Sequence, residues 1–183
     1  GVGVCYLYTL VALKRNGTPN VTDYGGMGES LTHWANGYDI YYNGMSNRID
    51  EIYSLHVGDE EGLLILKQYL YDHLDGSATG GIVNFYTDLY SYTSLPAGTP
   101  EEGKSVITEF GPYTGHSMTF IGWNDSIRWD YNGDGQYTND IDINGDGDVT
   151  MKDWEIGGVI LANSWGDDWA DSGFCYVMYN VLA

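Results

Sequence analysis

Hydrophobic and polar positions alternate with two kinds of spacing along this chain, one typical of helices and one typical of strands. Residues 60–74 carry leucines at helical spacing, at positions 63, 66, 70 and 74, and two glutamates stand in the first turn. Apolar residues three or four positions apart gather on one face of a helix, and acidic side chains favour its N-terminal end. We therefore predict an amphipathic helix over residues 60–74.

The N-terminal part of the chain is also predicted to be mainly helical. Residues 5–15 are apolar at most positions, and Gly17 after them suits a helix C-terminal cap. A short helix is expected over residues 29–35. Residues 37–58, where tyrosine and isoleucine are frequent, are expected to mix loop and strand.

The C-terminal part is predicted to form strands. Short apolar or alternating runs bounded by turn residues are typical of strands, and they occur at residues 82–92, 117–123, 157–165 and 173–182. Helices followed by strands predict an α+β protein with segregated lobes. We place a mainly helical lobe over residues 1–78 and a β lobe over residues 79–183.

The charge of the chain excludes several classes of function. Its 183 residues have a net charge of −19, from 26 acidic and seven basic side chains. An unaided nucleic-acid role is excluded because phosphate binding needs a basic surface. Adhesion to anionic membranes is excluded for the same reason, and no apolar run is long enough to span a bilayer.

Three short stretches carry candidate chemistry. Cys5 stands at the start of the first predicted helix, His116 opens a predicted strand, and Asn163 begins the segment NSWGDDW. A thiol is a weak nucleophile until it becomes a thiolate, which a helix N-terminus and a nearby histidine stabilise. An amide oxygen such as that of Asn163 can accept a hydrogen bond from the histidine ring and orient it.

The order Cys, His, Asn and the segment N-S-W-G-x-x-W-x-x-x-G together resemble the papain family of cysteine proteases, over nearly the whole chain. The resemblance implies a papain-like fold with an N-terminal helical lobe, a C-terminal antiparallel β lobe and an active-site cleft between them. It implies Cys5 as nucleophile, His116 as base and then acid, and Asn163 as the orienting residue. Supporting roles fall to Trp165 and Trp169, the first covering the histidine–asparagine contact. Peptide bonds would be hydrolysed through an acyl-thioester, without a cofactor.

Each of these residues has a simpler interpretation when taken alone. A lone cysteine in an apolar helix is more often a small buried side chain. A lone histidine is more often structural or exposed, and the NSWG segment could be a turn at a strand end. The combination in the family's order favours catalysis. The second cysteine, Cys175, lies in the middle of a predicted strand and is expected in the core.

One departure from the family concerns the oxyanion. The family has a glutamine six residues before the nucleophile, and its side chain donates to the developing oxyanion. Only four residues precede Cys5, which leaves the Cys5 backbone N–H as one donor. A second chain produced by proteolytic cleavage, a truncated sequence and a non-enzymatic relative are the three explanations. We expect one of the first two, with a cleaved N-terminal fragment as a partner, because all three catalytic residues are retained.

An acidic insertion at about residues 124–156 separates the histidine strand from the asparagine strand. Its second half resembles the calcium loops of EF-hands and dockerins, in which oxygen ligands alternate around a glycine at position 6. Loop positions 1, 3, 5, 7 and 12 are Asp142, Asn144, Asp146, Asp148 and Asp153. Position 7 ligates through its backbone carbonyl, so the Asp148 side chain need not take part.

The first half of the insertion begins in the same way. Its positions 1, 3, 5 and 7 hold Asp130, Asn132, Asp134 and Gln136. The twelfth residue is Ile141, so we expect Asp140 or Asp142 to close this loop, and sharing of Asp142 would resemble tandem loops of thrombospondin type. We predict two structural calcium ions. The alternative, a merely solvated acidic loop, would leave its many carboxylates repelling one another.

The leading interpretation is therefore a calcium-stabilised cysteine endopeptidase. Abundant extracellular calcium favours a secreted or cell-surface location, and we expect a bacterial source. The alternative is a catalytically silent papain-like protein that binds peptides or a partner through the same cleft. A dockerin-like adhesion module would explain the acidic loops but not the other motifs.

Overall fold

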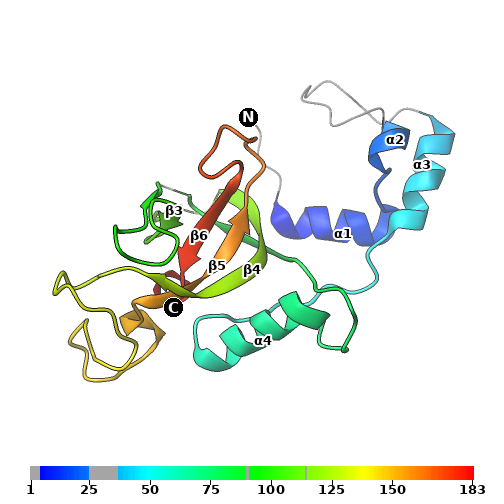
Figure 1. Cartoon of the computed structure of the whole chain (residues 1–183). Coiled ribbons are helices and arrows are strands. Elements are labelled where there is room, and N and C mark those ends of the chain that lie inside the picture. Colours follow the sequence, from blue (N-terminus) through cyan, green and yellow to red (C-terminus); the bar gives the residue numbers. More distant parts are fainter. Residues whose placement is uncertain (1–4, 25–36, 90, 114) are drawn as a thin grey trace. The chain divides into compact units, whose positions relative to one another are not determined.

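The computed structural model describes residues 5–24, 37–89, 91–113 and 115–183 (Figure 1). The chain divides into two compact units, Gly1–Ser54 and Leu55–Ala183. This division puts helix α4 (Glu60–Asp72) in the same unit as the strands. The lobe boundary between residues 78 and 79 stays a prediction.

The first unit consists of short helices. Helix α1 (Tyr6–Asn16) begins directly after Cys5, and α2 spans Val21–Tyr24. Helix α3 (Tyr38–Gly44) runs into the 3₁₀ turn η1 (Met45–Asn47). Gly17 ends α1 with a φ of 71°, and a Cβ at this position would overlap the carbonyl oxygen of Gly44. Only glycine fits both the backbone conformation and this contact.

Helix α3 corrects the expectation of mixed loop and strand over residues 37–58. Tyr41 and Tyr42, which suggested a strand, instead lie in α3, and the rings of Tyr38 and Tyr42, one helical turn apart, have centroids 5.6 Å apart. Such i,i+4 contacts stabilise a helix, whereas strand propensity depends on a neighbouring strand. The predicted short helix at 29–35 lies outside the described residues.

A six-stranded sheet with the order β1-β4-β5-β6-β3-β2 forms the second unit. Its strands are β1 (Val83–Thr87), β2 (Thr93–Ser94), β3 (Ser105–Ile107), β4 (His116–Arg128), β5 (Ile156–Ala162) and β6 (Phe174–Met178). Together with α4, this sheet confirms an α+β fold.

The sheet is mixed, which corrects the predicted antiparallel β lobe. Strands β3 and β6 run parallel, with Val106 opposite Tyr176, while the other neighbouring strands are antiparallel. The parallel pair arises because β3 of the β2–β3 hairpin pairs with the edge of β6 that faces away from β5. The predicted strand at 173–182 is also shorter than expected, since Tyr179–Leu182 form the 3₁₀ turn η3.

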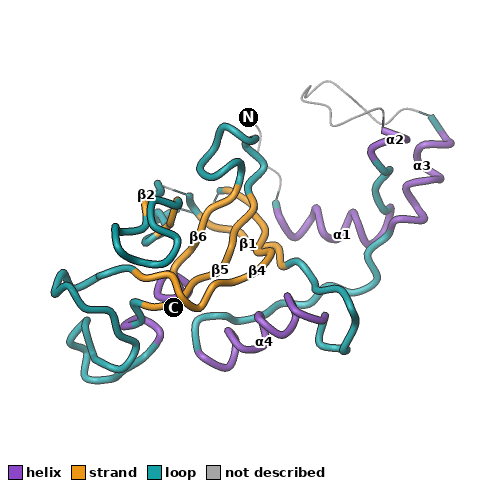
Figure 2. Tube along the Cα trace, viewed as in Figure 1, coloured by secondary structure: helices purple, strands orange, loops and turns teal. Residues whose placement is uncertain are grey.

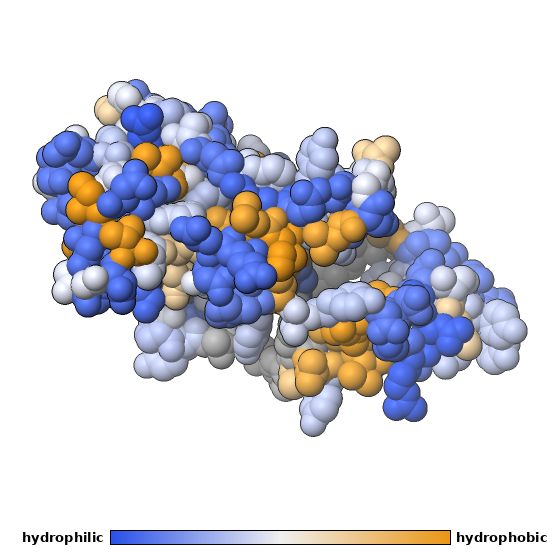
Figure 3. Space-filling view, turned by 90° about the horizontal axis from the view of Figure 1, so that it is seen from below, coloured by the Kyte–Doolittle hydropathy of each residue, from blue (hydrophilic) through white to orange (hydrophobic). Residues whose placement is uncertain are grey.

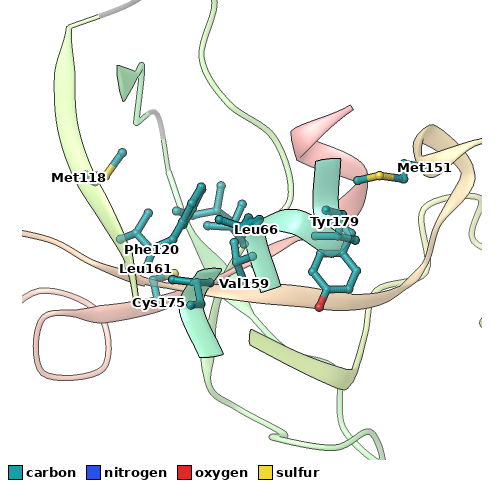
Figure 4. Packing of buried hydrophobic residues seen from close by; sticks show 12 residues of the cluster. Leu66, Met118, Phe120, Met151, Val159, Leu161, Cys175 and Tyr179 are labelled. Carbon is teal, nitrogen blue, oxygen red and sulfur yellow. The ribbon is translucent and has the colours of Figure 1, made fainter. Parts of the chain in front are cut away.

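Helix α4 packs on the sheet and confirms the predicted helix as far as Asp72, whereas Leu74 lies beyond its end and is exposed. Asp59 caps its start, and the Asp59 carboxylate accepts a hydrogen bond of 2.8 Å from the Gly62 N–H. The buried leucines Leu63, Leu66 and Leu70 join the main core cluster, which Figure 4 shows in part. This core holds the strands that carry His116 and Asn163.

A charged contact also joins α4 to strand β4. Lys67 Nζ lies 2.6 Å from an Asp125 carboxylate oxygen, and the Tyr179 hydroxyl donates to the same oxygen at 2.7 Å. Partial burial alone would raise the pKa of Asp125, but hydrogen bonds from Lys67 and Tyr179 outweigh it and lower that pKa.

The segment between β4 and β5 is almost entirely loop, with one 3₁₀ turn, η2 (Met151–Asp153) (Figure 2). It lies at the left of Figure 1, and the corresponding end of the surface in Figure 3 is mostly hydrophilic. Within the described part of the chain, no helix is both long and apolar enough to cross a membrane.

Candidate active site and acidic loops

His116 and Asn163 lie at matching ends of two paired strands. His116 is the first residue of β4, and Asn163 directly follows β5. The register of this pair sets Thr119 opposite Ala162, and the Asn163 N–H donates to the Gly173 carbonyl at 3.0 Å. The hairpin thereby brings together two residues 47 positions apart in sequence.

The contact between these two side chains fixes the proton on the histidine. Asn163 Oδ1 accepts a hydrogen bond of 2.8 Å from the Ser164 N–H and lies 2.7 Å from His116 Nε2. A backbone N–H can only donate, so the Asn163 oxygen must face both groups. That oxygen can only accept, so Nε2 carries the proton and the neutral imidazole keeps its lone pair on Nδ1.

Two tryptophans pack beside the His116–Asn163 pair. The Trp165 ring stacks on His116 with centroids 4.6 Å apart and 23° between the planes. Trp169 meets Trp165 edge-on at 6.1 Å and also packs against the main core. Trp165 is 53% exposed, so it covers one face of the imidazole and leaves its own outer face to solvent. This packing limits rotation of the His116 ring.

One atom of the pair lacks a partner. Among the described residues, the buried Asn163 Nδ2 has no hydrogen-bond partner. Since the Asn163 oxygen accepts from the Ser164 N–H, which can only donate, this nitrogen cannot be exchanged with it without losing that hydrogen bond. The amide orientation is therefore determined by the oxygen side alone.

The two cysteines differ sharply in environment. Cys5 is exposed, is not in a disulfide and immediately precedes α1 in the first unit. Its approach to His116 stays a prediction. Cys175 is buried in the main core, as expected from its place in a strand. Burial, together with the nearby Asp171 carboxylate, raises the pKa of Cys175 to about 12.

The two halves of the acidic insertion fold as a structural repeat. Asp130 accepts from the N–H groups of Gly133 and Gly135, and Asp142 accepts in the same way from Gly145 and Gly147. In each half, the residue at loop position 3 then accepts from position 5 and position 5 accepts from position 7, in the pairs Asn132–Asp134, Asp134–Gln136, Asn144–Asp146 and Asp146–Asp148. The predicted twelve-residue spacing thus has a matching backbone path in both halves.

Asp153 holds the second loop from inside. Its side chain is fully buried and accepts hydrogen bonds from the N–H groups of Ile143, Asn144 and Thr150 at 2.9 to 3.2 Å. Burial alone would raise the pKa of Asp153, but these backbone donors lower it.

Glu155 is the residue that sequence reasoning missed. It is fully buried, and its two carboxylate oxygens accept from the N–H groups of Tyr131 at 2.8 Å and Thr138 at 3.2 Å. Its place beyond the second loop gave no signal, because the spacing rule directs attention to residues near position 12 of the first loop.

The insertion is anchored to the second unit at several points. Met151 is part of the main core, and the Tyr131 hydroxyl donates to the Thr108 carbonyl at 3.2 Å. The Asn139 amide oxygen accepts from the N–H groups of Glu155 and Ile156, at the start of β5. The insertion is therefore continuous with the strands that position the candidate active site.

As the loops stand, no group of three or more His, Cys, Asp or Glu side chains in the described ranges is gathered to hold a metal ion. The calcium assignment of the predicted ligands stays a prediction. Their donor set, carboxylate and amide oxygens without thiol or imidazole, is the chemistry that calcium prefers.

Searches of protein-family models, curated proteins and solved structures find no significant match to the chain.

Proposed function

We propose that the chain is a papain-like cysteine endopeptidase, with its cleft between a helical lobe that carries Cys5 and a β lobe that carries His116 and Asn163. The observation that supports this most is the geometry of the His116–Asn163 pair under Trp165. A histidine with its Nε2 proton engaged and its Nδ1 lone pair available is what a thiol nucleophile requires. The order Cys, His, Asn in the sequence identifies Cys5 as the candidate nucleophile.

The proposed reaction begins with proton transfer from the Cys5 thiol to His116 Nδ1. The positive end of α1, which follows Cys5, favours the resulting thiolate. Sulfur then adds to the peptide carbonyl, and the Cys5 N–H donates to the oxyanion of the tetrahedral intermediate.

The remaining steps return the site to its starting state. Collapse of the intermediate breaks the C–N bond, and the His116 imidazolium gives its proton to the leaving amine. The acyl group remains on sulfur as a thioester. Water, deprotonated by His116, then attacks this thioester and releases the acid and the Cys5 thiolate, which takes the proton back from the His116 imidazolium. Throughout, Asn163 accepts from Nε2 and holds the ring in position.

Hydrolysis of a peptide substrate by the full chain tests this function. Cys5→Ser and His116→Ala should each abolish turnover. His56→Ala is the matched control, because His56 is a highly exposed histidine of the same unit and should keep wild-type activity. Peptide binding without any turnover, unchanged by Cys5→Ser, would support the silent peptide-binding relative instead.

We also propose that the insertion binds two structural calcium ions. The loops would ligate them through the carboxylate, amide and backbone oxygens at their alternate positions. Because the insertion joins β4 to β5, an ordered insertion keeps these strands in register and so keeps His116 beside Asn163. An extracellular location would supply the calcium.

Thermal unfolding with and without a chelator tests the calcium role. A single ion at a hundred times its Kd adds about 2.7 kcal/mol to the free energy of unfolding. Chelation should therefore lower Tm by several degrees, and activity should fall only as the fold loosens. An unchanged Tm would refute the structural role.

A further inference from the structure

We propose that Glu155 closes the first acidic loop as Asp153 closes the second, so that the insertion forms one coupled pair of cation sites. This inference rests on the calcium role proposed above. It assigns a closing ligand that lies outside the first loop and beyond the whole of the second.

The argument begins with a correspondence between the two closing carboxylates. Asp153 accepts from the N–H groups at positions 2 and 9 of the second loop, which are Ile143 and Thr150. Positions 2 and 9 of the first loop are Tyr131 and Thr138, and both donate to Glu155. Glu155 thus holds the same place in the first loop that the position-12 aspartate holds in the second.

The complete burial of Glu155 beside the first loop also supports this assignment. Its side chain is 0% exposed, and no cationic side chain within the described ranges forms an ion pair with it. A cation bound in the first loop would give this buried carboxyl group a partner that no described side chain supplies. Each of its oxygens accepts a hydrogen bond from one backbone N–H, which leaves lone pairs for a cation at the loop.

The residues first expected to close this loop are less suitable. Asp142 already stands at position 1 of the second loop, where its carboxylate accepts from the N–H groups of Gly145 and Gly147. Asp140 is exposed, and its one hydrogen bond here is the backbone N–H donated to the Thr138 hydroxyl. Neither side chain accepts a hydrogen bond from the Tyr131 or Thr138 N–H, the two donors bound by Glu155.

This placement couples the two sites. Asp153 and Glu155 flank Trp154, whose N–H donates to the Met151 carbonyl at 3.2 Å. A cation in the second loop would fix Asp153 and with it the short segment that carries Glu155. Filling the second site should therefore favour filling the first, and by linkage the reverse holds as well.

Calcium titration of the chelator-treated full chain, followed by calorimetry, tests the assignment. Wild type should bind two ions with positive cooperativity. Glu155→Gln keeps the size of the side chain but removes its charge, and should weaken one site by at least about tenfold and abolish the cooperativity. Asp140→Asn is the matched control and should keep both sites and the cooperativity of wild type.

The outcomes separate this inference from the calcium role itself. Two wild-type sites in Glu155→Gln, or loss of a site in Asp140→Asn, would overturn the assignment and leave two calcium ions in place. Wild type that binds no calcium would overturn both proposals. If Glu155→Gln does not fold, Glu155→Asp carries the test, since its shorter side chain cannot hold both Tyr131 and Thr138. Unweakened binding of both ions by that variant would then refute the assignment.

Discussion

Helix α4 offers a sharp test of the packing, through two leucines two residues apart. Leu66 is 0% exposed in the main core, whereas Leu64 is 66% exposed on the same helix. Truncation of each to alanine changes the helix propensity by the same amount, so the difference between the two variants reports packing alone.

The expected magnitude follows from this difference in burial. Removal of a fully buried leucine side chain costs about 3 kcal/mol, within a range of about 2–5 kcal/mol. An exposed substitution away from special features stays within about 0.5 kcal/mol. At about 3 °C for each kcal/mol in a domain of this size, Leu66→Ala should lower Tm by about 10 °C and Leu64→Ala by less than 2 °C.

Urea unfolding of the full chain, followed by circular dichroism, measures both variants. The unfolding midpoint should fall strongly for Leu66→Ala with an unchanged m-value and should hardly move for Leu64→Ala. Equal losses in the two variants would refute the packing of α4 on the sheet. A large loss in Leu64→Ala alone would mean that the opposite face of the helix is the buried one.

Three further predictions concern single side chains. Asn163→Ala should lower kcat/KM on a peptide by about 10- to 100-fold, since a hydrogen bond to a charged imidazole contributes about 1.5–3 kcal/mol; wild-type kcat/KM would contradict the orienting role. In native protein Cys175 should resist alkylation at pH 8 and react only after unfolding, because its pKa is about 12; mass spectrometry that finds the native Cys175 adduct would disprove its burial. The pKa of Asp125 is lower in the folded protein than in the unfolded chain, where it is about 4. Ionised Asp125 therefore stabilises the fold above that unfolded pKa, and this stabilisation is lost as the pH falls through the folded pKa. The Tm difference between wild type and Tyr179→Phe, which removes the hydroxyl but keeps Lys67 in place, should accordingly shrink on going from pH 6 to pH 3, and a constant difference would count against this contact.

Periodicity predicted the elements that pack by one face. The leucine pattern located α4, and the Asp59 cap fixes where the helix starts. The same reasoning failed for α3, where tyrosines at helical spacing stabilise a short helix through local ring contacts. It could not foresee that β3 would run parallel to β6, because pairing between distant strands leaves no local periodicity.

For the candidate site, linear motifs located residues but not all of their partners. The segment that begins at Asn163 and the strand that begins at His116 were found in sequence, and the β4–β5 pairing brings the two together. The hydrogen bond from Ser164, which sets the amide orientation, is visible only in three dimensions. The contact of Glu155 with the first loop was not predicted, because the chain passes through the complete second loop before Glu155 returns to the first.

The central claim, that Cys5 is a nucleophile activated by His116, is tested most directly by a peptide carrying a thiol-reactive electrophile. Mass spectrometry of the labelled full chain should find one adduct per chain, on Cys5. The adduct should be lost in His116→Ala and kept in His56→Ala. A Cys5 that is not labelled, or that is labelled equally fast without His116, would contradict the proposed peptidase.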